Sequence, residues 1–408
     1  MRERARHAIA ECQLLAGITE EPGRITRRFL TPPMRDVHAH LRRRMVALGM
    51  EVHVDGAGNL RGVWKPERVG PRRLVLGSHV DTVPDAGAYD GVLGVMLALE
   101  WVRIAQEAAL PLRIEVIAFS EEEGVRFGVP FLGSRAVAGR FDRALLGLKD
   151  ANGITLEESI RAFGLDPAAI DEAHVDEDAL GFVEIHIEQG PILESERLSL
   201  GVVNRIVGQT RLSLEFAGQA NHAGTTPMHL RRDAMAGAAE WIGAVEGFAS
   251  KTEGIAATVG RIVVEPNAAN VIPGKARVSL DVRHALDAER ESAVEILSAK
   301  ARSIADRRGL TLNCTRQMNE PAVPMDERLT AYLVDAVEAA GFPGRTMASG
   351  AGHDAMVMAT RLPAAMLFLR SPGGISHHPS ETVLEEDVEA ALQVGRKFLE
   401  RLASEAGS

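Results

Sequence analysis

The sequence contains few cysteines and no long apolar run. Cys12 and Cys314 are the only thiols among its 408 residues, which excludes a disulfide framework and any cysteine-rich zinc module. No uninterrupted apolar stretch approaches the roughly 20 residues of a membrane span, and the charged N-terminal segment lacks the apolar core of a signal peptide. We therefore expect a cytoplasmic protein with no membrane partner.

An excess of positive charge is also absent. The chain has 46 Lys and Arg against 56 Asp and Glu, a formal net charge of -10. This balance offers no electrostatic footprint for nucleic acid, so we expect no nucleic-acid partner. The length corresponds to two or three domains at about 100 to 200 residues each, and 46% hydrophobic residues supply their cores.

Strand and helix patterns alternate in the first part of the chain, which is typical of an α/β fold with a mainly parallel sheet. Short apolar strands are predicted over residues 72–81, 112–124 and 181–193, and each ends in polar residues. The apolar segment 91–106 predicts a crossover helix that covers the sheet. Because open α/β sheets carry their sites at the carboxyl ends of the strands, we expect a site there.

Near residue 209 the pattern changes to strand, helix, strand, strand, helix, strand, which predicts a separate α+β (βαββαβ) domain. Its helices are predicted over residues 233–249 and 288–307. The first pattern then resumes. The predicted domains are a first domain made of residues 1–208 and 324–408 and an inserted domain of residues 209–323.

Histidines and carboxylates concentrate at the predicted strand ends. His79 and Asp81 alternate along one strand and so point to one side, and Asp90 follows in a glycine-rich loop. Three carboxylates, residues 121–123, crowd the end of the next strand. Adjacent like charges cost stability unless a proton or cation compensates them. Imidazole with carboxylate oxygen is a ligand set of zinc and related divalent ions, so the sequence predicts a metal site in which Asp81 supports His79.

Six motifs follow one another between about residue 55 and about residue 395. They are HVDTVP with the later Asp90, SEEEGVRF, EIHIEQGPILE, NHAGTTPM, SGAGHDA and GISHHPSE. In this order they resemble the M20 metallopeptidase family, and more closely its amidase (hydantoinase/carbamoylase) branch. That branch holds allantoate amidohydrolases, N-carbamoyl-L-amino acid hydrolases and β-ureidopropionases. The resemblance implies a metallopeptidase-like catalytic domain and an inserted domain that acts as a lid and forms a homodimer.

The resemblance implies two divalent metal ions per subunit. The matching ligand positions are His79, Asp90, Glu123, His186 and His377. Asp90 would bridge the ions, with His79 and His186 on one and Glu123 and His377 on the other. The general base would be Glu122, next to a variable position at Glu121. Zinc is the expected metal, and nitrogen and oxygen ligands also admit manganese, cobalt or nickel.

Substrate positions of the family also have matches. They are Gln189, His222, Asn270, Arg283, Gly352 and His353. His222 is implied to stabilise the developing oxyanion and Arg283 to clamp a substrate carboxylate. The chain departs from the family at His378, where the usual motif reads His-Asn-Pro.

The implied reaction is hydrolysis of the ureido C–N bond of a small carboxylate-bearing substrate, with release of ammonia and CO2. Allantoate and N-carbamoyl-L-amino acids are the expected substrates. A β-ureidopropionase, an N-acyl deacylase or peptidase on the same metal core, and a non-catalytic metal-binding protein remain as alternatives.

The predicted helix over residues 233–249 is rich in small and apolar residues around most of its circumference. A helix that covers one face of a small sheet should instead show a broad polar stripe. We therefore expect its second face to contact another subunit, in which case His222 reaches the metal site of the neighbour. The alternative is a lid helix that packs only within its own chain.

Overall fold

The computed structural model describes residues 1–66, 73–177 and 179–406, and its chain divides into two compact units. The first unit comprises Met1–Asn204 and Met325–Ser408, and the second comprises Arg205–Pro324. The second unit is thus inserted into the sequence of the first, with limits a few residues from the predicted ones. Arg72, where the first predicted strand starts, and Ser408 lie outside the described residues.

A nine-stranded sheet has its centre in the first unit, in the order β1-β2-β4-β3-β5-β16-β6-β14, with β15 paired to β6; the edge strand β14 falls within the second unit by the limits above. The strands are β1 (Glu51–Val54), β2 (Leu60–Trp64), β3 (Arg73–His79), β4 (Arg113–Phe119), β5 (Gly181–Ile187), β6 (Leu200–Ile206), β14 (Val323–Pro324), β15 (Thr346–Ser349) and β16 (Ala364–Leu369). The four central strands, β4, β3, β5 and β16, run parallel. The pairs β1–β2, β2–β4, β6–β16 and β6–β14 are antiparallel. The expectation of a mainly parallel sheet therefore describes the centre, and the flanks differ because short apolar strands do not encode their direction.

All three strands predicted for this sheet end earlier than the apolar pattern suggested, and β5, expected to reach residue 193, stops at Ile187. β3 stops at His79, so Asp81 lies in the following loop and does not alternate with His79 along a strand. Beyond the strand, the Asp81 carboxylate accepts hydrogen bonds from the backbone of another loop. β4 likewise stops at Phe119, before the acidic residues.

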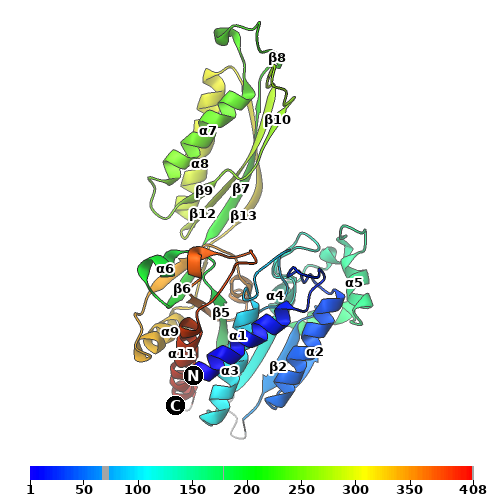
Figure 1. Ribbon diagram of the computed structural model, residues 1–408, viewed down its shortest axis with the longest axis vertical. Helices are drawn as coiled ribbons and strands as arrows, with labels where there is room; N and C mark the ends of the chain where they lie inside the picture. Colours follow the sequence, from blue (N-terminus) through cyan, green and yellow to red (C-terminus); the bar gives the residue numbers. More distant parts are fainter. Residues whose placement is uncertain (67–72, 178, 407–408) are drawn as a thin grey trace. The chain divides into compact units, whose positions relative to one another are not determined.

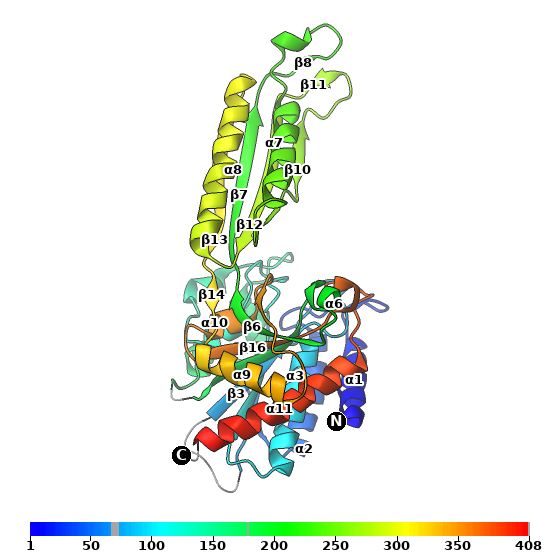
Figure 2. The ribbon, with the colours of Figure 1, turned by 90° about the vertical axis from the view of Figure 1, so that its left-hand side faces the viewer.

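Helices α1 (Arg2–Ala16), α3 (Val92–Glu107) and α11 (Glu385–Ala406) pack on one another, α9 (Glu327–Ala339) packs on α11, and α3 lies on β3 and β5 (Figures 1 and 2). The remaining helices of this unit are α2 (Pro32–Ala47), α4 (Leu132–Val137), α5 (Leu156–Ala162), α6 (Ile192–Glu196) and α10 (Asp354–Met358), with short 3-10 turns at Arg143–Gly147, Pro167–Ala173 and Pro372–Gly374. α3 approaches the sheet closely because Gly94 has no side chain. A Cβ at Gly94 would lie 2.0 Å from the main-chain oxygen of Ile185.

The second unit has an antiparallel five-stranded sheet in the order β10-β12-β7-β13, with β9 also paired to β12. Its strands are β7 (Gly208–Ala217), β9 (Ala256–Thr258), β10 (Ile262–Glu265), β12 (Lys275–His284) and β13 (Thr311–Glu320), and a separate ladder joins β8 (Asn221–His222) to β11 (Val271–Ile272). Helices α7 (Ala234–Ala249) and α8 (Asp287–Arg307) cover one face around the buried Trp241, and a 3-10 turn spans Met228–Leu230 (Figure 2). The segment expected as one strand before β12 is split into β9 and β10 around Gly260.

Within the described part of the chain, none of the helices has the length and apolar character that a bilayer-spanning segment requires.

Candidate metal centre

The residues expected to bind metal lie at the carboxyl edge of the parallel strands. His79 is the last residue of β3 and His186 is the last but one of β5. Glu123 follows β4, Asp90 precedes α3, and His377 lies in the loop between β16 and α11. Because the carboxyl ends of adjacent parallel strands meet at one edge, residues nearly 300 positions apart in sequence are brought together.

The position of Asp90 depends on the glycine that follows it. Gly91 has a φ of +67°, and a Cβ there would lie 2.4 Å from His79 Nε2. Another residue would be strained and would push the His79 imidazole away. Gly91 thus lets the Asp90 loop pass directly over the histidine, where α3 begins.

Asp90 stands at the centre of two groups of ligand atoms. Its Oδ1 lies 3.1 Å from His186 Nε2 and 3.5 Å from His79 Nε2, whereas its Oδ2 lies 3.1 Å from His377 Nε2. Glu123 Oε1 lies 3.6 Å from the same atom of His377. These residues form two triads, His79–Asp90–His186 and Asp90–Glu123–His377. In each triad the ligand atoms lie within 4.8 Å of one another, and only Asp90 belongs to both triads.

These residues fit two divalent cations. Among the described residues Asp90 Oδ1 is buried without a hydrogen-bond partner. His79 Nδ1 lies 3.0 Å from the main-chain oxygen of Asp81, and His186 Nδ1 lies 2.9 Å from that of Ile187. Those contacts place the protons on Nδ1, so both Nε2 lone pairs, 3.4 Å apart, face Asp90. A cation would satisfy this otherwise unfavourable arrangement.

The pKa shifts of the acidic residues in the cluster also indicate a site that fits a cation. Burial, with the charge of Asp90, raises the pKa of the Glu123 carboxyl to about 7. Burial alone would also raise the pKa of Asp90, but the close contacts of its carboxylate with the imidazoles of His186, His377 and His79 outweigh burial and hold that pKa well below its usual range. Without a cation, the protein therefore confines a carboxylate and three imidazoles that compete for protons.

Asp81 supports the site differently from the sequence-based expectation. The acceptor nearest to His79 Nδ1 is the main-chain oxygen of Asp81, while its carboxylate Oδ1 is 3.6 Å away. The carboxylate instead accepts hydrogen bonds from the backbone N–H groups of Glu122 at 3.0 Å and Glu123 at 3.1 Å. Asp81 thus links the strand end of His79 to the acidic loop.

Three of the substrate candidates lie in the first unit. Gln189 Nε2 donates to Asp90 Oδ2 at 3.0 Å. The buried His353 ring lies 4.5 Å from the His186 ring, centroid to centroid, and its Nε2 lies 3.0 Å from Ser349 Oγ. Gly352 precedes it in the same loop.

The other three substrate candidates, His222, Asn270 and Arg283, lie at opposite ends of the second unit. His222 in β8 pairs with Val271, and the neighbouring Asn270 accepts a hydrogen bond from Ala223, so His222 and Asn270 share one ladder. Arg283 lies near the far end of β12, roughly 25 Å along the strand from the end at which that ladder lies. Within one chain the structure therefore does not bring Arg283 to His222 and Asn270.

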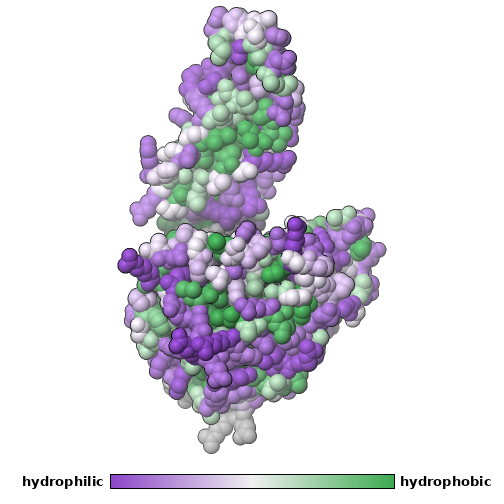
Figure 3. Space-filling view, in the orientation of Figure 1, coloured by the Kyte–Doolittle hydropathy of each residue, from purple (hydrophilic) through white to green (hydrophobic). Residues whose placement is uncertain are grey.

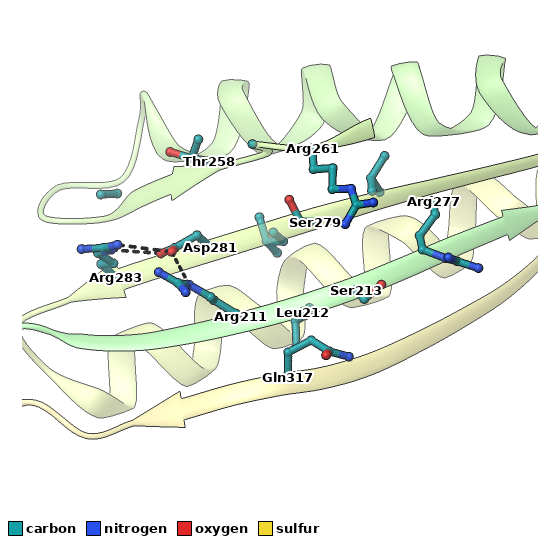
Figure 4. A pocket seen from close by; sticks show the side chains of 14 residues that line it. Arg211, Leu212, Ser213, Thr258, Arg261, Arg277, Ser279, Asp281, Arg283 and Gln317 are labelled. Atoms are coloured by element: carbon teal, nitrogen blue, oxygen red, sulfur yellow. Dashed lines mark hydrogen bonds and ion pairs between the residues drawn. The ribbon is translucent and has the colours of Figure 1, made fainter. Parts of the chain in front are cut away.

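Arg283 lies in a pocket of about 690 Å³ on the open face of the sheet (Figure 4). Its Nε donates to Asp281 Oδ1 at 3.0 Å, and Arg211 Nε donates to Asp281 Oδ2 at 2.9 Å. Figure 4 shows both guanidinium groups directed at this one carboxylate. Asp281 thus sets the orientation of Arg283.

Sequence reasoning missed two residues of the GISHHPSE motif and left a third without a role. Ser376 Oγ lies 3.3 Å from Asp90 Oδ2, and Glu381 accepts from the backbone of Asp90. His378 Nδ1 accepts from the Ser380 N–H at 3.1 Å, two residues on. An asparagine makes the same kind of turn, which explains how histidine replaces it here.

Comparisons with known proteins agree over most of the chain. A family model described as peptidase family M20/M25/M40 matches residues 75–401. The allantoate deiminase of Arabidopsis thaliana is 36% identical over 96% of this chain and 81% of its own length. The N-carbamoyl-L-amino acid amidohydrolase of Geobacillus stearothermophilus is 35% identical over 93% of this chain and 94% of its own. A crystal structure of a hydantoinase/carbamoylase family amidase from Burkholderia multivorans has a TM-score of 0.90, 33% identity and 97% coverage of both chains.

The two triads predict different consequences for two substitutions. Asp90→Ala should reduce the occupancy of both metal positions because both triads use that residue, whereas His377→Ala should empty mainly one. Metal per chain, measured by mass spectrometry after dialysis against Zn2+, tests this. The exposed His174→Ala is the control and should bind as the unmodified protein does. Equal loss in the Asp90 and His377 variants would contradict the shared-ligand geometry.

Proposed function

Since the chain belongs to peptidase family M20/M25/M40, we propose that it hydrolyses the ureido C–N bond of a small carboxylate-bearing substrate at a site with two divalent metal ions. It is an amidohydrolase, acting on C–N bonds other than peptide bonds. The observation that carries the proposal is the pair of ligand triads joined at Asp90. The amidase relatives are 33% to 36% identical to this chain, whereas a tripeptidase structure of similar coverage is 16% identical, which favours this reaction over peptide hydrolysis.

Allantoate or an N-carbamoyl-L-amino acid is the proposed substrate. Relatives named for these two activities are equally similar to this chain, at 36% and 35% identity. Both substrates carry a carboxylate and a ureido group. Attack of water on the ureido carbon releases the amine and carbamic acid, which decomposes to ammonia and CO2.

Glu122 is the proposed general base. When bound, divalent cations polarise the carbonyl and lower the pKa of water. Glu122 is 7% exposed and lies with His79 and Glu123 in a third cluster of ligand atoms. Burial, opposed by His79 and reinforced by Glu123, raises the pKa of the Glu122 carboxyl well above its usual range. Such a carboxyl can accept the proton of the attacking water, hold it, and deliver it to the leaving nitrogen.

Glu122→Gln should lower kcat for ammonia release at least about a hundredfold, because the amide cannot accept the proton. Metal content should stay unchanged, since Glu122 is in neither ligand triad. The matched control is Glu121→Gln, next to it and also buried, where the amide oxygen still accepts from the Arg126 N–H. Full turnover of the Glu122 variant on a panel of ureido acids would remove this role.

Arg283 is the proposed clamp for the substrate carboxylate. Arg283→Lys should lower kcat/KM for carboxylate substrates about ten- to a hundredfold, the value of a lost bidentate charge-assisted contact. Arg277→Lys on the same strand, where the arginine pairs with Glu215, is the control. An unchanged preference for the carboxylate substrate over its amide analogue would show that Arg283 is not the clamp.

We further propose a homodimer formed through α7. The exposed side of this helix carries Met235, Ala239, Gly243 and Gly247, and Figure 3 shows apolar surface over α7. Such small residues allow a second helix to approach closely. The distance between Arg283 and the ladder of His222 supports a site shared between two copies, because a small ureido acid is only a few Å long.

Mixing two inactive variants, Glu122→Gln and His222→Ala, should restore activity in a shared-site dimer. Half of the reassorted dimers are then mixed, and each has one intact site, so about a quarter of the original activity is expected. Each variant alone, carried through the same exchange, is the control. No recovery, or a sedimentation mass near 43.9 kDa, would exclude this arrangement.

A further inference from the structure

Glu381 joins two loops that carry metal-binding candidates. Its side chain is 5% exposed. Oε1 accepts hydrogen bonds from the backbone N–H groups of Tyr89, at 2.9 Å, and Asp90, at 3.1 Å. Oε2 lies 3.3 Å from the hydroxyl of Ser376, the residue before His377. The carboxylate therefore connects the backbone of the Asp90 loop to the loop of His377.

The surrounding chain is shaped to this carboxylate. A Cβ at Gly87 would lie 2.3 Å from Glu381 Oε1, so the loop before Asp90 closes directly over the acid. The N–H of Glu381 donates to the main-chain oxygen of His378 at 3.0 Å, which closes a turn after His377. Replacement of Glu381 would thus release both the hydroxyl of Ser376 and the loop over it.

The two triads differ in how the protein supports them. His79 and His186 lie on hydrogen-bonded central strands and are buried. His377 lies in a loop, its side chain is 48% exposed, and its φ of +55° is in the left-handed region. That conformation is unfavourable for a non-glycine residue and persists only where its surroundings hold it.

Asp90 itself has support that does not involve Glu381. The N–H of Val92 donates to the main-chain oxygen of Asp90 at 2.7 Å, and Gly91 fits against His79. The side of Asp90 that faces His79 and His186 is therefore held by the start of α3. Loss of the Glu381 side chain should instead disturb the other side of Asp90, where Ser376 and His377 approach its Oδ2 atom.

We propose that Glu381 is a positioning residue for the metal site formed by Asp90, Glu123 and His377. The metal site formed by His79, Asp90 and His186 does not need it. The inference rests on the proposed two-metal function. It predicts that the two positions lose metal unequally when the link between the loops is removed.

The test is calorimetric titration of metal-free protein with Zn2+, together with the absorption spectrum after Co2+ addition. The unmodified protein should bind two ions. Glu381→Ala should keep one and weaken the second about tenfold or more, the usual loss when a group that supports a ligand is removed. Glu381→Gln should retain both ions within about threefold, because its amide oxygen still accepts from both N–H groups and its NH2 donates to Ser376.

The matched control is Asp387→Ala. Asp387 lies in the same segment, is fully buried and accepts two hydrogen bonds from Arg370, so its loss should lower thermal stability. Its two hydrogen bonds from Arg370 lie at the end of β16, seven residues before His377, and neither involves Asp90, Ser376 or His377, so both ions should still bind. If Glu381→Ala does not fold, Gly87→Ala places a Cβ against the carboxylate and should produce the same selective loss.

Three results would overturn the inference: unchanged binding in Glu381→Ala, equal weakening of both ions, or a Gln variant as defective as the Ala variant. Fewer than two ions on the unmodified protein would reject both this inference and the two-metal proposal. Two bound ions without ammonia release from ureido acids would reject only the proposed function.

Discussion

A buried carboxylate surrounded by three imidazoles is the arrangement on which the rest of the site depends. Asp90 cannot be solvated, and its Oδ1 lacks a hydrogen-bond partner among the described residues. Burial of such a charge is unfavourable unless opposite charge compensates it. Two glycines make room for this arrangement. Gly91 lets the Asp90 loop approach His79, and Gly94 lets the following helix approach the strand that carries His186.

Around this centre the supporting groups are mostly backbone amides held by buried acids. Asp81 fixes the loop of Glu122 and Glu123, and Glu381 fixes the backbone of Asp90 itself. The acidic loop has a second anchor, because Asn59 Oδ1 accepts from the N–H of Ser120 at 3.0 Å. Carboxylates that accept backbone hydrogen bonds hold the loops in place through the main chain and leave the other side chains of the cluster free to face one another.

The second unit contributes a different kind of surface. One face of its sheet packs under α7 and α8, and the other is lined by polar side chains, among them the guanidinium groups of Arg211 and Arg283 on either side of Asp281. A fixed carboxylate between two arginines orients them while leaving the group as a whole positive.

Some features were readable from the sequence because they are local. The apolar segment that forms α3 has its helical pattern within 16 residues, and the helix lies where it was expected. The GISHHPSE and SEEEG strings identified candidate ligands by resemblance, since a motif preserves residue type and spacing. The parallel centre of the sheet was readable for a similar reason, because a crossover helix lies between β3 and β4.

Only the tertiary structure decided how those pieces meet. It showed that the outer strands are antiparallel, that Asp81 has left its strand, and that Glu381 holds the backbone of residues about 290 positions earlier. It also separated Arg283 from His222 within one chain. Hydrogen-bond partners so distant in sequence leave no periodic signal, because the pattern of a segment records what it buries and not which loop it will touch.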